Sequence, residues 1–129
     1  MPIRYTFSGN LFRMNLEGSY TPEEMKKTFE QALNDPLFPE NARFLLDVRK
    51  SSELSERSYN DIKTVAQFFA AHSDRVSGRC AIVADKEVHY GLSRMGATFA
   101  EIKGARIEVF RDINEAILWI GGDTDPPIR

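Results

Sequence analysis

The sequence predicts a single α/β domain with a mixed sheet, in which an N-terminal β-hairpin joins parallel central strands. Two runs of alternating hydrophobicity at the start enclose a Gly-Asn turn. Three later apolar runs alternate with segments of helical period, and strand–helix–strand units require parallel pairing. The length of 129 residues fits one domain with its own hydrophobic core.

The chain opens with the hairpin. Apolar and polar side chains alternate in residues 3–8 and again in 12–17, as expected for strands with one buried face. Gly9 and Asn10 separate these runs and suit a two-residue turn, so the two strands are expected to pair antiparallel.

A helix follows the hairpin. Thr21 suits the N-cap and Pro22 the first helical position, and Glu24 completes a capping box. Because Pro36 disfavours helix at the residue before it, the helix is expected to end near Asn34. Its predicted apolar stripe consists of Met25, Phe29, Ala32 and Leu33.

Three strand–helix units complete the predicted order β-β-α-β-α-β-α-β-α. Residues 43–48 and 78–84 are almost wholly apolar, which favours strands covered on both faces, whereas residues 105–110 alternate more. The predicted helices follow Ser58 and span 86–100 and 113–120. Their stripes are expected at Ile62, Val65, Ala66 and Phe69, and at Val88, Leu92, Met95, Phe99 and Ile102. The domain is expected to span residues 1–122, with a loose tail at 123–129.

Composition excludes several classes of function. The 17 basic and 19 acidic side chains give a net charge of -2, which argues against nucleic acid as a partner. One cysteine, Cys80, allows no internal disulfide and favours the cytoplasm. No apolar run is long enough for membrane insertion. Two widely separated histidines, His72 and His89, make no metal motif, and we expect no metal and no cofactor.

Four segments carry a resemblance to a known family: GNLFRMNLEG, ARFLLDVR, RCAIVADKEVHYGLSRM and VFRDINEAILWIGG. Together they resemble the STAS domain of sporulation anti-anti-sigma factors, and more closely the small bacterial SpoIIAA-like proteins. The resemblance covers residues 3 to 122. It implies a regulatory or protein-interaction module without catalysis, acting on an unknown protein partner.

The resemblance also bears on a serine-rich connection, residues 51–58. STAS domains of the anti-sigma type carry a phosphorylatable serine in an Asp-Ser-Ser-Gly motif at the start of the helix after the third strand. That motif falls here on SERS, where Arg57 takes the place of the modified serine. Ser55 and Ser58 are therefore the candidate phosphoacceptors. The alternative is local, because serines commonly cap helices and stabilise turns.

The carboxyl ends of the parallel strands give a second candidate site. Ligands bind there in open α/β sheets, and helix N-termini at the same edge favour anions. Asp47, Asp85 and Asp112 partly cancel that positive field. The candidate ligand- or partner-binding residues are Arg49, Lys50, Ser52, Lys86, His89, Tyr90, Arg94 and Arg111.

Three hypotheses for function remain open. The first is the interaction module, acting through residues 49–58 and the edge of the second helix. The second is a binder of a small anionic or lipid-like molecule, which requires an apolar pocket near Arg49, His89 and Tyr90. The third is a hydrolase using Ser55, His89 and Asp47, although no Gly-x-Ser-x-Gly elbow is present. A homodimer through an exposed edge strand at 105–110 fits any of them.

Overall fold

The computed structural model describes residues 3–51, 59–76, 79–102 and 106–121, and it confirms the predicted single-domain α/β class with a mixed sheet. Five strands form one sheet in the order β1-β2-β3-β4-β5. The elements in chain order are β1 (Ile3–Ser8), β2 (Leu11–Gly18), α1 (Pro22–Leu33), β3 (Arg43–Ser51), α2 (Tyr59–Ala71), a 3-10 helix (Ser73–Val76), β4 (Arg79–Val83), α3 (Glu87–Ile102), β5 (Arg106–Phe110) and α4 (Ile113–Gly121).

The sheet has the predicted pairing. β1 and β2 form the antiparallel hairpin, and β3, β4 and β5 run parallel. β2 also pairs in parallel with β3, so the hairpin extends the sheet at the side of β3. The turn residue Gly9 has a φ of 60°, which costs glycine little because it lacks Cβ.

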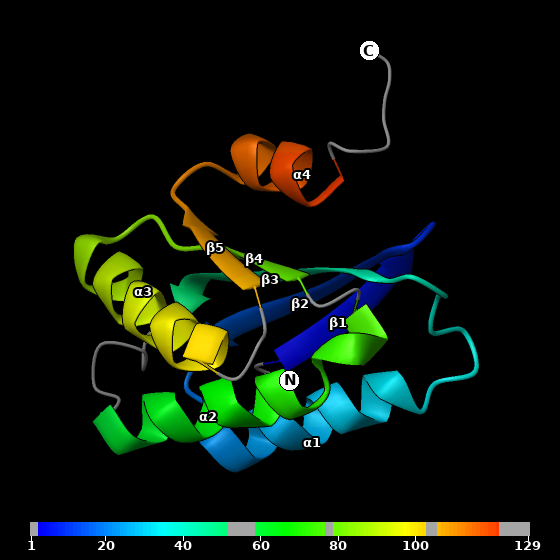
Figure 1. Ribbon diagram of the computed structural model, residues 1–129, viewed down its shortest axis with the longest axis horizontal. Coiled ribbons are helices and arrows are strands. Elements are labelled where there is room, and N and C mark those ends of the chain that lie inside the picture. The colour runs from blue at the N-terminus through cyan, green and yellow to red at the C-terminus, as the bar shows by residue number, and fades with distance from the viewer. Residues whose placement is uncertain (1–2, 52–58, 77–78, 103–105, 122–129) are drawn as a thin grey trace.

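The helices lie on both faces of the sheet. Figure 1 shows α1 and α2 below the sheet and α4 alone above it. The larger core lies between the sheet and α1, α2 and α3, and phenylalanine rings fill its centre. The Phe44 ring stacks on Phe12 at a centroid distance of 4.7 Å and on Phe69 at 5.6 Å. On the opposite face, Ala116 and Ile120 of α4 cover a smaller apolar cluster.

The first helix begins as predicted. Thr21 Oγ1 accepts a hydrogen bond from the Glu24 N–H at 3.1 Å, and the Glu24 carboxylate accepts from the Thr21 N–H at 2.8 Å. Phe29 and Leu33 are buried on the predicted stripe. The capping residues in the sequence therefore predicted the start of this helix correctly.

The predicted stripe of α3 is only partly described. Among the described residues of α3, Ser93 and Ala97 are buried, and Leu92 and Met95 of the predicted stripe are half-buried. The side chains of Val88, Phe99 and Ile102 lie outside the described residues. Leu92 lines the same helix-side pocket as Ser93 and Gly96, and the small side chains beside it allow α3 to pack closely.

β3 runs through Ser51, three residues beyond the predicted end at Val48. Asn15 and Glu17 of β2 pair with Asp47 and Lys50 of β3, so β3 carries one extra residue there. Such a bulge changes the side-chain alternation of the strand. Val48 and Ser51 therefore both face the helix side, although they are three residues apart.

None of the helices in the described part of the chain combines the length and hydrophobicity needed to span a bilayer.

Candidate functional site

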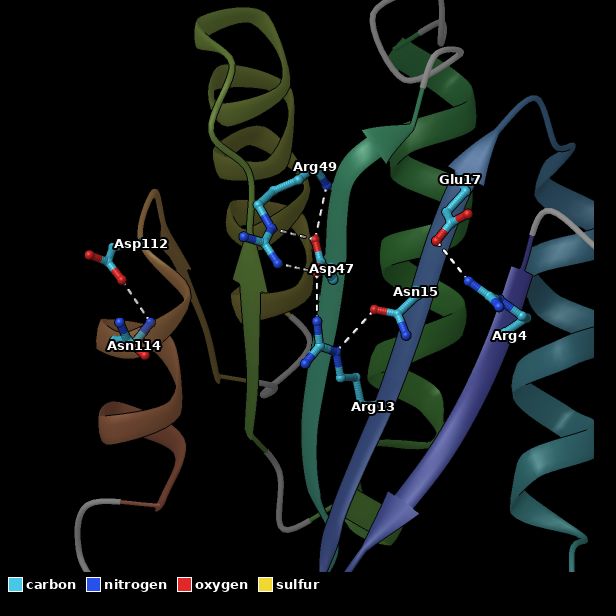
Figure 2. A network of polar contacts seen from close by, with 8 residues as sticks. All are labelled: Arg4, Arg13, Asn15, Glu17, Asp47, Arg49, Asp112 and Asn114. Carbon is cyan, nitrogen blue, oxygen red and sulfur yellow. Dashed lines mark hydrogen bonds and ion pairs between the residues drawn. The ribbon is translucent and has the colours of Figure 1, made fainter.

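The sheet face on the α4 side is open over β1, β2 and part of β3, and polar side chains occupy it. Phe12, Met14 and Leu16 of β2 point into the helix-side core. The intervening residues Arg13 and Asn15 therefore point to the α4 side. Figure 2 shows these side chains next to Asp47 and Arg49 of β3.

Asp47 is the centre of this polar network. Its Oδ2 accepts hydrogen bonds from Arg49 Nη2 at 2.7 Å and from Arg13 Nη2 at 3.0 Å. Its Oδ1 accepts from Arg49 Nε at 3.0 Å and from the Arg49 backbone N–H at 3.1 Å. Both oxygens therefore accept hydrogen bonds, and the carboxylate links β3 to β2.

Burial raises the pKa of Asp47, but the hydrogen bonds from Arg49 and Arg13 outweigh that effect and hold the pKa below its ordinary value. The hydrogen bond to Asp47 in turn raises the pKa of Arg49, to which nearby Asp85 and Asp112 also contribute. The Asp47 side chain is 10% exposed, whereas those of Arg13 and Arg49 are about one-third exposed. The carboxylate is thus internal to the network, and the guanidinium groups remain accessible.

A depression of about 210 Å³ lies over this network. Besides Arg13, Asp47 and Arg49, Glu17 and Lys50 contribute charges to its lining. Three cations thus face two carboxylates, and Glu17 is itself paired with Arg4 at 2.9 Å. The described lining residues therefore sum to one positive charge, which Asp85 and Asp112 near Arg49 partly offset.

Exposed apolar side chains of α4 stand beside the open face. Leu118 is 68% exposed and Ile117 is 40% exposed. The Gly121 carbonyl, one turn after Ile117, accepts from Arg43 Nη1 of β3 at 3.5 Å. The C-terminal end of α4 therefore lies at the start of β3, on the same side of the sheet as the polar network.

At the carboxyl ends of the strands, the predicted cations are already paired. Arg111 forms an ion pair with Glu87 and lies 4.1 Å above the centre of the Tyr90 ring. Lys86 Nζ donates to the Arg49 carbonyl at 3.5 Å. Asp112 caps α4 by accepting from the Asn114 N–H at 2.7 Å. Carboxylates and backbone oxygens thus already neutralise much of the expected anion site.

The other predicted site residues are not gathered here. Arg94 is exposed on α3, one turn beyond Tyr90. The side chain of His89 lies outside the described residues, as do Ser52, Ser55 and Ser58.

The local interpretation of the serine-rich connection predicts Ser51 in a turn, but Ser51 does not lie in one. It is fully buried at the end of β3, and its hydroxyl hydrogen-bonds that of Tyr20 at 2.8 Å. The bond links the end of β3 to the start of α1, so the role of Ser51 is structural.

Sequence reasoning missed Arg13, Asn15 and Glu17. Their alternation on β2 was visible, but no signal indicated that β2 pairs with β3 and so places Arg13 beside Asp47. Sequence reasoning also missed Ser93. Its spacing with Gly96 and Ala97 makes a small-residue stripe, which was the available signal. Within the described residues, no group of three or more histidine, cysteine, aspartate or glutamate side chains could hold a metal ion.

Comparison with known proteins identifies the class. The sequence profile of the SpoIIAA-like family matches residues 11–121, and the chain belongs to that family. The family consists in general of regulatory or interaction modules that typically interact with proteins and are in general non-catalytic.

A solved structure confirms the fold. The chain is similar to an uncharacterised protein with a SpoIIAA-like fold from Shewanella loihica PV-4, with a TM-score of 0.56 and 19% sequence identity. The likeness covers 92% of this chain and 91% of that protein. No functionally curated protein matches the sequence significantly.

Proposed function

We propose that this protein is a non-catalytic interaction module of the cytoplasm, which binds an acidic segment of a partner protein on its α4-side face. One observation carries the proposal: two arginines share the carboxylate of Asp47, and they lie on the same side of the sheet as the exposed apolar side chains of α4. An apolar centre with a charged surround is the usual anatomy of a protein interface.

The partner chemistry follows from these charges. A partner carboxylate can pair with Arg49 or Lys50 at the rim, while an apolar neighbour contacts Ile117 and Leu118. Paired charges of this kind steer association and weaken with salt. We therefore expect the affinity for the partner to fall as ionic strength rises.

The same network counts against the hydrolase hypothesis. A catalytic aspartate must accept a hydrogen bond from its histidine. Within the described residues, the hydrogen bonds to Asp47 come from Arg13 and Arg49 and engage both carboxylate oxygens. The proposal therefore assigns Asp47 a structural role.

The test is affinity capture from the native host, followed by calorimetric titration of the purified captured protein. The double variant Ile117→Ser/Leu118→Ser and the single variant Lys50→Glu should each lower the affinity about tenfold, the effect of an interface hot spot. The matched control is Leu37→Ser, because Leu37 is 77% exposed but follows α1 on the opposite side of the sheet. A control variant that weakens binding as much as the α4 variants would overturn the proposal.

We also propose that phosphorylation of Ser55 or Ser58 tunes this binding. The support is the family resemblance and the position of both serines shortly after Arg49 and Lys50 in the chain. Intact mass of the protein from its native host should fall by one phosphate on phosphatase treatment, and Ser55→Ala/Ser58→Ala should abolish that change. An unchanged mass would contradict this part alone.

A further inference from the structure

A second pocket lies on the helix side of the sheet, away from the α4-side face. It has a volume of about 110 Å³, and residues of α1, α2, α3 and the sheet line it. Phe29, Phe69, Leu46 and Ile82 are typical of its walls, which are almost entirely apolar. For comparison, an engineered apolar cavity of about 150 Å³ binds benzene. The pocket is smaller than that cavity and therefore has room for an apolar group of about five carbons, slightly smaller than benzene.

One buried polar group in this pocket has no partner. Ser93 lines the pocket and is only 8% exposed. Within the part of the chain that the structure describes, its hydroxyl makes no hydrogen bond. A buried hydroxyl without a partner is unfavourable, and native structures rarely keep one without a reason. A ligand oxygen would supply the missing bond.

Lys26 gives the pocket its electrostatic character, because it is the only charged residue among the described lining residues. Its ammonium group lies 5.7 Å from the centre of the Phe68 ring. Its ion pair with Glu23 is long, at 3.6 Å, and the Glu23 side chain is 84% exposed. An ion pair this exposed contributes little to stability, so the ammonium group can bind another anion.

We propose that this pocket binds a small apolar carboxylic acid of about six carbons. The apolar body fills the space between α2 and the sheet, a ligand oxygen hydrogen-bonds Ser93 Oγ, and the negative charge is stabilised by Lys26. The ligand hypothesis drawn from the sequence required a pocket near Arg49, His89 and Tyr90. The apolar pocket found here is a different one, and among the described residues neither Arg49 nor Tyr90 lines it. The site also goes beyond the proposed interaction function, since the sheet separates the two faces.

The test uses hexanoate as the ligand and hexan-1-ol as its uncharged counterpart, each titrated into the full-length protein and followed by amide NMR. We expect saturable shifts at amides of α2 and α3, with hexanoate binding about fivefold tighter than hexan-1-ol because of Lys26. Equal affinity for both compounds would overturn the assignment to an acid. No saturable shift with either compound would overturn the site.

Two variants locate the ligand. Ser93→Leu fills the pocket and should weaken hexanoate at least tenfold, since the added side chain occupies the space of the ligand. Lys26→Met keeps the apolar stem without the charge and should remove the preference for hexanoate over hexan-1-ol. A far-ultraviolet spectrum and a cooperative thermal transition like those of the wild type verify that each variant is folded. Unchanged hexanoate affinity in folded Ser93→Leu would refute the site.

Discussion

Asp47 is the residue on which the charged face depends. Its folded pKa lies below the ordinary value of 3.8, so its ion pairs stabilise the protein fully above that value. The stabilisation is lost as the pH falls through the folded pKa. Asp47→Asn should lower the free energy of unfolding by about 2 kcal/mol near neutral pH, less than for a fully buried pair because both arginines are partly exposed.

Urea unfolding at about pH 7 and about pH 3 tests this role of Asp47. The difference between wild type and Asp47→Asn should be large at neutral pH and smaller at about pH 3, because the stabilisation is lost progressively as the pH falls from the ordinary pKa of 3.8 through the folded pKa. An equal difference at both values would mean that packing, and not charge, is the contribution of Asp47.

The two buried serines should respond to alanine in opposite directions. Ser93 has no hydrogen-bond partner in the described chain, so Ser93→Ala removes an unsatisfied hydroxyl and should raise the free energy of unfolding by about 1 kcal/mol. Ser51 bonds to Tyr20, so Ser51→Ala leaves the Tyr20 hydroxyl with one partner fewer and should lower it by about 1 kcal/mol. Thermal unfolding of both variants measures these changes. A loss of stability in Ser93→Ala would contradict the inference that the Ser93 hydroxyl has no partner within the described chain.

At the scale of elements, β3 shows why local pattern underestimates a strand. The apolar run is interrupted by Asp47, Arg49 and Lys50, so hydrophobicity alone predicts that the strand ends there. Pairing with β2 carries the strand on to Ser51, ordinary alternation places Asp47 and Arg49 on the open face, and the bulge turns Ser51 to the helix side. Such pairing depends on which strands lie next to one another in the fold, and the residue pattern within one strand does not show this.

The helix α4 is the element that closes one side of the molecule alone. Ile120 is 4% exposed and, with Ala116, covers Leu45 and Val83. Ile120→Ala should cost about 2–4 kcal/mol, because no neighbouring helix can move in to fill the space. In hydrogen exchange of this variant, amide protection should be lost first in α4 and last in β3, since local opening precedes global unfolding. Equal loss of protection throughout would mean that α4 does not open on its own.

At the scale of the whole molecule, the sequence predicted the class, the element order and the parallel centre, because periodicity and capping are local signals. It also named Arg49 and Lys50 as candidate binding residues at the carboxyl ends of the strands, and that role stays a prediction. It could not predict the shared carboxylate of Asp47, which depends on β2 pairing with β3. Nor could it predict the pocket at Ser93, which depends on how closely α3 packs. Both features arise from long-range packing.

Self-association belongs to this scale as well. β5 lies at one edge of the sheet, as predicted, and Arg106 and Glu108 on it are exposed. Antiparallel pairing of two copies about Ile107 would set Arg106 opposite Glu108 of the second copy, and opposite charges across strands are favourable. We expect concentration-dependent dimers in analytical ultracentrifugation that Glu108→Arg weakens. The swapped variant Arg106→Glu/Glu108→Arg should restore them, and a monomer at all concentrations would contradict this pairing.

The sheet should keep the two proposed binding functions independent. The charged depression and the exposed residues of α4 lie on one face, whereas the pocket at Ser93 lies on the other. A ligand that binds only the folded state raises the unfolding temperature by mass action. Hexanoate should therefore raise it equally in the wild type and in Lys50→Glu, and Ser93→Leu should bind the captured partner with wild-type affinity. Because each variant leaves the opposite face intact, either proposal can fail without the other. A variant that impaired both kinds of binding while remaining folded would show instead that the two faces are coupled through the sheet.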